Sequence, residues 1–116
     1  MKIWHSGDAI GAVPPGHYGG LTVADAISRT DSDGLFTVQL STCPPGGGGL
    51  AHQHDADMQV FYVISGSLSF EAGGDRFDIG PGQAVLFSPG EAHATHNHTD
   101  SASTALVITV SAQAQL

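Results

Sequence analysis

Short apolar stretches, separated by glycine, proline and aspartate, run through most of this chain. Two examples are Leu35 to Thr42, which follows Gly34, and Gln59 to Ser65, which precedes Gly66. Runs of this length with turn residues between them are typical of β-sandwiches and β-barrels, whereas alternating strands and helices would show longer stretches with a helical period. The pattern therefore predicts an all-β fold and indicates no helix.

The turn residues divide the chain into nine expected strands. These strands cover Leu21 to Ile27, Leu35 to Thr42, Leu50 to His54, Gln59 to Ser65, Ser67 to Glu71, Arg76 to Ile79, Ala84 to Ser88, His93 to Asn97 and Ser103 to Ser111. Gly73 and Gly74 predict a tight hairpin, because glycine adopts the positive φ that such turns require. The segment Ser41 to His52 contains two prolines and four consecutive glycines, and it is expected to be a loop.

Two of the expected strands, Gln59 to Ser65 and Ser103 to Ser111, are apolar on both faces. A strand of this kind must be covered on both sides. In a small barrel the second sheet covers one side, and another subunit is the simplest cover for the other. The length of 116 residues suits one domain, residues 1–116. We therefore expect a single domain that forms a homodimer.

Acidic side chains dominate the charge of the chain. Eleven carboxylates stand against Lys2, Arg29 and Arg76, and the formal net charge is −8. Nucleic acids and anionic membranes bind clustered lysine and arginine, so we expect neither as a partner. Cys43 is the only cysteine, which excludes an internal disulfide, and we interpret it as a small buried or loop residue. We find no signal peptide or membrane-spanning stretch and expect a cytoplasmic protein.

Three histidines and one glutamine form the most informative pattern of the sequence. His52 and His54 are two positions apart, so that in a strand both side chains point to the same face. Gln59 begins the next expected strand, and His93 comes from a later one. Imidazoles that converge from different strands inside a barrel are suited to bind a first-row divalent metal.

The spacing of these residues resembles the two sequence motifs of the cupin superfamily. The first motif has a glycine, His-x-His, a glutamate and a second glycine at fixed intervals, and Gly46, His52, His54 and Gly66 occupy the matching positions here. Gln59 stands where the family has glutamate. In the second motif Gly82, Gly90, His93 and Asn97 are in register, whereas Ser88 takes the proline position. The two motifs together cover about half of the chain.

The resemblance implies an antiparallel jelly-roll β-barrel with one divalent transition metal inside, bound by His52, His54, Gln59 and His93. The donors suit Zn, Fe, Ni, Mn, Co or Cu and do not select among them. Gln59 either binds the metal or hydrogen-bonds to a bound water, because an amide oxygen is a neutral and weaker donor than a carboxylate. With neutral ligands alone the ion keeps its full charge, which favours Lewis-acid over redox chemistry.

The remaining titratable side chains are weaker candidates for the site. Glu91 is either an acid or base at the mouth of the barrel or an exposed turn carboxylate. Strand parity places His96 and His98 on the solvent-facing side, away from the metal ligands. His5 and His17 belong to no pattern and are expected at the surface, from where either could still line the mouth.

These features predict a metal-dependent enzyme that acts on a small oxygenated organic molecule. The ion would act as a Lewis acid in cyclase, isomerase or lyase chemistry. Two alternatives stay open. One is a dioxygenase that uses Fe(II) or a similar ion with O₂, because three-histidine sites of the family support such chemistry. The other is a protein that binds a metal and a small ligand without turning the ligand over.

Overall fold

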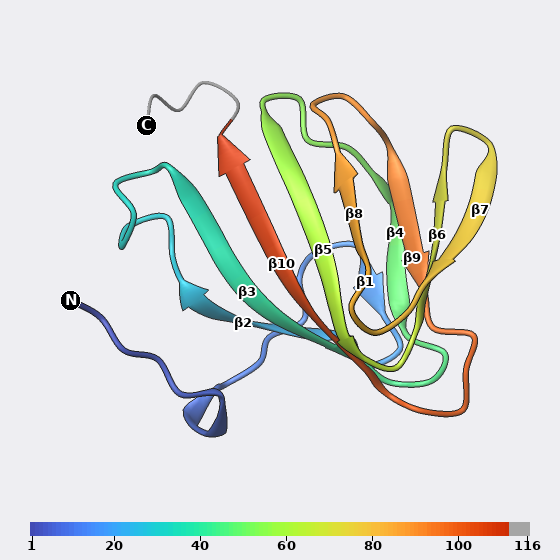
Figure 1. Cartoon of the computed structure of the whole chain (residues 1–116), viewed down its shortest axis with the longest axis horizontal. Coiled ribbons are helices and arrows are strands. Elements are labelled where there is room, and N and C mark those ends of the chain that lie inside the picture. The colour runs from blue at the N-terminus through green and yellow to red at the C-terminus, as the bar shows by residue number, and fades with distance from the viewer. Residues whose placement is uncertain (112–116) are drawn as a thin grey trace.

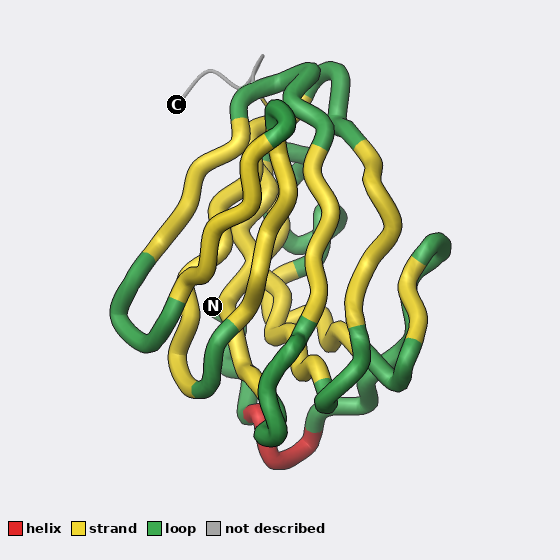
Figure 2. Tube along the Cα trace, turned by 90° about the vertical axis from the view of Figure 1, so that its right-hand side faces the viewer, coloured by secondary structure: helices red, strands yellow, loops and turns green. Residues whose placement is uncertain are grey.

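Two antiparallel β-sheets lie against each other in this protein (Figure 1). The computed structural model describes residues 1–111. Ten strands and one short 3-10 turn span this part of the chain. The strands run alongside one another and are joined by loops at both ends (Figure 2). The prediction of an all-β fold is therefore confirmed.

The strand boundaries agree closely with those expected. The elements are η1 (Ser6–Asp8), β1 (His17–Tyr18), β2 (Thr22–Ile27), β3 (Phe36–Cys43), β4 (Gly48–His52), β5 (Asp57–Ser65), β6 (Leu68–Ala72), β7 (Asp75–Ile79), β8 (Ala84–Phe87), β9 (His93–His96) and β10 (Ser103–Ser111). Only β1 lacks an expected counterpart, because two residues are too few to show alternation. The expected loop over residues 41–52 is wrong in part, since Gly48 and Gly49 belong to β4. Within residues 1–111, no helix has the length and hydropathy to cross a lipid bilayer.

The strands form two sheets of five, and strands distant in sequence pair within each sheet. The first, called here the β10 sheet, has the order β2-β3-β10-β5-β8, and the second, the β9 sheet, has the order β1-β4-β9-β6-β7. In the β10 sheet, β3 and β10 pair from Phe36↔Val110 to Cys43↔Ser103. The predicted hairpin is confirmed: Gly73 and Gly74 join β6 to β7 with φ values of 60° and 82°.

Side chains alternate between the inside and the outside of the β10 sheet. In β10, Ala105 and Val107 are buried between the sheets, whereas Leu106 and Ile108 face outward and are half-buried. The adjacent β5 alternates in the same way, with Val63 fully buried. Both strands are thus apolar on both faces, as predicted, and only the inner face is covered by the second sheet.

An apolar core fills part of the space between the sheets. Its buried members are Leu21, Cys43, Val63, Leu68, Phe70, Phe87 and Ala105. Phe61 packs edge-on against Phe70, with ring centroids 5.0 Å apart. Burial raises the pKa of the Cys43 thiol, so this group is a neutral core residue, in agreement with its interpretation from the sequence.

The four consecutive glycines let β1 lie close against β4. His17 is the register partner of Gly49, and Tyr18 is the partner of Gly48. A methyl group on Gly49 would lie 2.8 Å from the His17 ring, and one on Gly48 would overlap the carbonyl oxygen of Thr95 in β9. Both contacts are closer than packed atoms tolerate. Gly48 is therefore required by packing, whereas a side chain at Gly49 would displace the His17 ring.

We predict that Gly48→Ala lowers the free energy of unfolding by about 1–3 kcal/mol, because the added methyl group overlaps a backbone atom that the sheet holds in place. Urea unfolding measures this change. Gly7→Ala is the control, since a Cβ at Gly7 has no heavy atom of the described chain within 4 Å. Its effect should stay within about 0.5 kcal/mol. Equal stability of the two variants would contradict the packing argument.

Candidate metal centre

A cavity of about 160 Å³ lies between the two sheets. Its apolar lining consists of Pro14, Leu21, Val23, Phe61, Leu68 and Val107, and its polar lining consists of His17, Gln39, Ser41, His52, His54, Gln59 and Thr95. A concave space with a few polar groups on an apolar wall is typical of a small-molecule site. Three of the four residues predicted to bind a metal line this cavity, and the fourth, His93, contacts them.

The pairing of β4 with β9 brings His52 and His93 together. The two residues are register partners, and their ring centroids are 4.6 Å apart. A β-bulge between Gly49 and His52 adds one residue to β4 at this point. Regular alternation from the inward position of Gly49 would turn His52 outward. The bulge therefore aims the His52 ring at the cavity.

His54 reaches the same place from the segment that follows β4. Its ring centroid lies 5.3 Å from that of His52 and 6.3 Å from that of His93. The expected strand over residues 50–54 is wrong at its end, because β4 stops at His52. The two imidazoles are neighbours all the same, so the structure brings together the three predicted histidines.

Backbone carbonyls fix the orientation of two of these rings. His52 Nδ1 lies 3.0 Å from the carbonyl oxygen of Leu50, and His93 Nδ1 lies 3.3 Å from that of Glu91. A carbonyl only accepts, so each Nδ1 carries the proton and each Nε2 keeps its lone pair. The Nε2 atoms of His54 and His93 are buried without a hydrogen-bond partner in the described chain. Buried polar atoms of this kind are rare in proteins unless a ligand or water completes them.

The side chain of Gln59 also has a buried polar atom without a hydrogen-bond partner in the described chain. Its Nε2 donates to Thr109 Oγ1 at 3.1 Å, across the pair of strands β5 and β10. Its Oε1 is buried and unpartnered within the described residues. Thr109 thus holds the amide with its oxygen free, which is the arrangement that a metal ligand or a partner for a bound water needs.

His93 is kept neutral by its surroundings. Its ring stacks on Phe87 with centroids 4.1 Å apart and is 1% exposed. The pKa of His93 is lowered to about 4, mainly because the ring is buried and secondly because His52 lies next to it. A neutral imidazole is the form that coordinates metals, so this position favours metal binding at neutral pH.

The donors fit a divalent transition metal, although they do not form a finished ligand set. In residues 1–111, no three histidine, cysteine or carboxylate side chains stand in a complete metal-binding arrangement. The ring of His52 is inclined at 89° to that of His54 and at 60° to that of His93. The Nε2 atoms of His52, His54 and His93 and the Oε1 atom of Gln59 are nevertheless the donor type that such ions prefer.

His17 is a cavity residue that the sequence analysis placed at the surface. It lies on β1, and its ring centroid is 5.7 Å from that of His52. Its Nδ1 donates to the carbonyl oxygen of Pro15 at 3.0 Å, which leaves its Nε2 with a lone pair. The sequence feature that indicates a cavity position for His17 is the run of glycines that β1 pairs with. Glycine has no side chain, so it leaves room there for the His17 ring.

The other candidates of the sequence analysis lie outside the cavity. The Glu91 carboxylate accepts a hydrogen bond from the Ser88 backbone N–H at 2.8 Å and is exposed, as expected for a turn carboxylate. His96 faces the opposite side of the β9 sheet, where its Nδ1 lies 2.8 Å from the Tyr18 hydroxyl. The His98 ring lies beside that of His96, with the centroids 4.2 Å apart and the planes inclined at 51°, and His5 is exposed.

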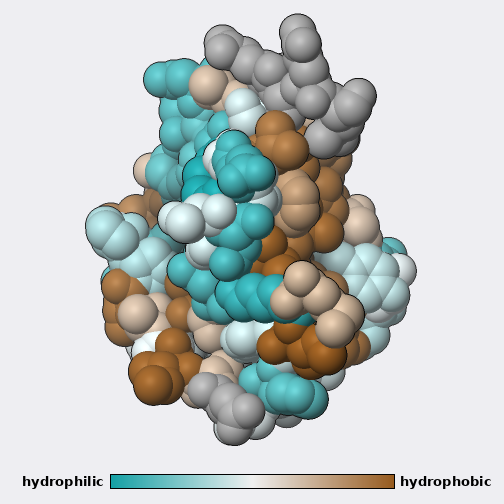
Figure 3. All heavy atoms as spheres, turned by 90° about the vertical axis from the view of Figure 1, so that its left-hand side faces the viewer, coloured by the Kyte–Doolittle hydropathy of each residue, from teal (hydrophilic) through white to brown (hydrophobic). Residues whose placement is uncertain are grey.

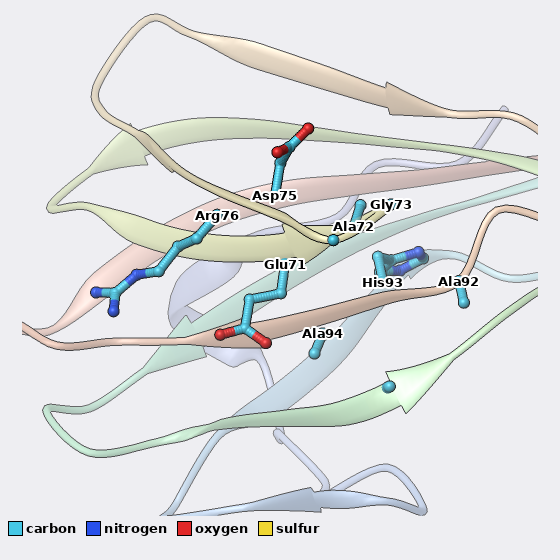
Figure 4. Close-up of a pocket in the computed structure, with 10 residues that line it drawn as sticks. Glu71, Ala72, Gly73, Asp75, Arg76, Ala92, His93 and Ala94 are labelled. Carbon is cyan, nitrogen blue, oxygen red and sulfur yellow. The ribbon is translucent and has the colours of Figure 1, made fainter.

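A larger but shallower hollow, of about 390 Å³, lies over β6, β7 and β9. Alanines and glycines form much of its surface, and its charged members are Glu71, Asp75 and Arg76. Figure 4 shows that these three side chains point in different directions and do not converge on one point. The cavity between the sheets, with its grouped imidazoles, is therefore the better candidate for chemistry.

Comparison with protein families agrees with this geometry. Residues 39–109 match the family model described as the cupin domain. The chain belongs to the cupin family, and its two sheets form the jelly-roll sandwich of that family. No curated protein sequence matches the chain significantly.

Several solved structures share the fold. A predicted oxalate decarboxylase from Thermotoga maritima superposes with a TM-score of 0.88 at 18% identity, covering 95% of this chain and 99% of that protein. The polyketide cyclase RemF from Streptomyces resistomycificus gives 0.82 at 24% identity, covering 95% and 79%. A sugar phosphate isomerase of the cupin superfamily from Silicibacter pomeroyi gives 0.72 at 25% identity, covering 88% and 69%. Similar folds thus carry decarboxylase, cyclase and isomerase names.

The metal-free protein should lose stability as the pH falls from about 6.5 to about 4. In that range the unfolded chain binds a proton at His93 and the folded chain does not, because its pKa is lowered to about 4. The loss should reach about 3 kcal/mol. Urea unfolding across this range, compared between the native chain and His93→Gln, isolates the effect from other groups. Identical pH dependence in both proteins would contradict it.

Thr109→Val should weaken Zn²⁺ binding by roughly tenfold or more, because the Gln59 amide loses the hydroxyl that orients it. Isothermal titration calorimetry with Zn²⁺ measures the affinity. Thr109→Ser keeps the hydroxyl and should bind like the native chain. Equal affinity of the valine and serine variants would show that Thr109 does not position Gln59 for the metal.

Proposed function

We propose that this cupin is a metal-dependent enzyme that acts on a small oxygenated organic molecule by non-redox chemistry of the cyclase, isomerase or lyase type. The observation that carries the proposal is the group formed by His52, His54 and Gln59 on the wall of a small cavity and by the His93 ring beside that of His52. Two of the nitrogens and the amide oxygen are buried without hydrogen-bond partners among residues 1–111.

His52, His54 and His93 would hold the ion through their Nε2 atoms, and Gln59 would contribute Oε1 either directly or through a water. A divalent ion bound there would supply Lewis-acid chemistry, by lowering the pKa of a hydroxyl or polarising a carbonyl. The absence of an anionic side chain from this donor set supports Lewis-acid over redox chemistry, because no ligand charge offsets that of the ion.

The rest of the cavity suits a small substrate with an oxygenated end and an apolar body. Phe61, Leu68 and Val107 form a dry wall that excludes water from the bound molecule. Ser41 and Gln39 offer a hydroxyl and an amide on the same lining. A volume of about 160 Å³ admits only a small ligand, or one part of a larger ligand.

His17 is the residue best placed to move a proton. Its Nδ1–H bond to the Pro15 carbonyl holds the ring over Gly49, and its Nε2 has the lone pair of a general base. It lies beside His52 without belonging to the proposed ligand set. The hydroxyl of a bound substrate at the mouth of the cavity would therefore meet a proton acceptor.

The metal assignment has a direct test. His52→Ala and His93→Ala should each reduce bound Zn²⁺ or Co²⁺ from about one ion per chain to near zero, and they should abolish the rise in thermal stability that the metal gives the native chain. His96→Ala and His98→Ala are matched controls from the outer face and should keep the metal. Elemental analysis measures the content. Full retention in the first pair would reject the proposed ligands.

The reaction type is tested on the metal-loaded chain with a panel of phenols, diketones and hydroxy acids. Product formation without oxygen uptake supports the non-redox proposal, and His17→Gln should then slow turnover at unchanged metal content. Oxygen uptake with Fe²⁺ would contradict the non-redox proposal and indicate a dioxygenase. Tight binding of a panel member with no turnover would favour a binding protein.

A further inference from the structure

A short segment near the start of the chain closes one side of the cavity between the sheets. Residues 12–18, called here the strap, pair at one end with β2, where Ala12 and Val23 exchange two backbone hydrogen bonds of 2.9 and 2.8 Å. At the other end the strap forms β1, which lies beside β4 (Figure 1). Pro14 and His17 line the cavity. The strap therefore carries His17 into the cavity wall.

Packing against the rest of the protein holds the strap only weakly. Among residues 11–20, only Pro14 and His17 are half-buried, and the others are exposed. Val13 is 56% exposed, and Figure 3 shows apolar surface beside polar groups on the side of the molecule that carries β2 and β3 in Figure 1. The strand β1 has two residues. Short segments with few buried contacts open locally at low cost, so the position of His17 depends on individual contacts of the strap.

One side-chain contact ties β1 to the strand beyond β4. The Tyr18 hydroxyl oxygen lies 2.8 Å from His96 Nδ1, and the ring centroids are 5.9 Å apart. This hydrogen bond is called here the clasp. Tyr18, Gly48 and His96 are register partners on β1, β4 and β9, so the Tyr18 side chain reaches across β4. Gly48 leaves room for it, since a Cβ there would lie 2.7 Å from the Tyr18 hydroxyl oxygen.

We propose that Tyr18 and His96 are positioning residues, whose hydrogen bond on the outer face of the β9 sheet holds the His17 ring in place inside the cavity. The inference rests on the proposed function, in which His17 is the base. Tyr18 and His17 are consecutive in β1 and point to opposite faces of the sheet. When Tyr18 is held against β9, His17 stays over Gly49 with its Nδ1–H bonded to the Pro15 carbonyl.

The clasp acts on the base and leaves the proposed metal ligands in place. His52 and His93 belong to β4 and β9, and His54 follows β4 directly, so none of the three is part of the strap. Loss of the clasp should therefore displace the base at unchanged metal content. A metal ligand set that depended on the clasp would instead lose the ion.

Amide hydrogen exchange of the full metal-free chain, followed by NMR, tests the clasp without any reaction. Tyr18→Phe removes only the hydroxyl group. The Leu50 N–H, which donates to the Gly16 carbonyl of the strap at 2.9 Å, should then exchange roughly fivefold faster, because one hydrogen bond no longer holds β1. The Gly82 N–H, which donates to the Val63 carbonyl at 2.9 Å, reports opening of the rest of the fold and should keep its native rate.

A double-mutant cycle separates the clasp from independent structural roles of its two residues. His96→Ala should match Tyr18→Phe in the exchange rate of Leu50 and in the loss of the Nδ1–H signal of the His17 ring. The double variant should be no faster than either single variant, because both remove the same bond. His98→Ala is the matched control from the same face, since His98 makes no hydrogen bond to Tyr18 within residues 1–111, and it should behave like the native chain.

Each result decides the proposal. A native Leu50 rate in Tyr18→Phe, equal acceleration at Leu50 and Gly82, or additive effects in the double variant would overturn it. On the Zn²⁺-loaded chain, Tyr18→Phe should lower kcat for a phenol of the panel roughly fivefold at unchanged KM and Zn²⁺ content, and a displaced His17 ring with native kcat would overturn its role as the base. If the native chain turns over no panel member, the proposed function fails, whereas the exchange rates and the ring signal still decide on the clasp.

Discussion

The antiparallel pairing of β4 with β9 is the contact on which the candidate centre depends. It sets His52 opposite His93, two residues that are far apart in the chain, and the bulge before His52 turns its ring inward. Phe87 closes the other side of the His93 ring and keeps the imidazole dry and neutral. A change in this register by one residue would separate the His52 and His93 rings.

The strand β1 completes the cavity and restricts which residues can stand opposite it on β4. A side chain at Gly48 would overlap the Thr95 carbonyl oxygen of β9, and one at Gly49 would displace the His17 ring, which lies over Gly49 beside the other imidazoles. Tyr18 takes the outer side of the same sheet and reaches His96. A glycine run that looks like a loop in the sequence is therefore part of a strand, with one ring on each side.

The β10 sheet separates two kinds of apolar surface. Its inner face contributes Val107 and Phe61 to the cavity, and Thr109 orients Gln59 there. Its outer face carries the second set of apolar side chains, of which Leu86 is among the most exposed. Because alternate residues of one strand serve both faces, the cavity wall and the outer apolar face are encoded in the same few strands.

The sequence by itself determined the all-β class, most strand boundaries and the residue types of the centre, because alternation and turn residues are local properties. His52, His54, Gln59 and His93 could be chosen because their spacing resembles the two cupin motifs. Only the tertiary structure decided the bulge in β4, the position of His17 and the free oxygen of Gln59. These features depend on which strands pair and in which register, and pairing between distant segments leaves no periodic trace in either segment.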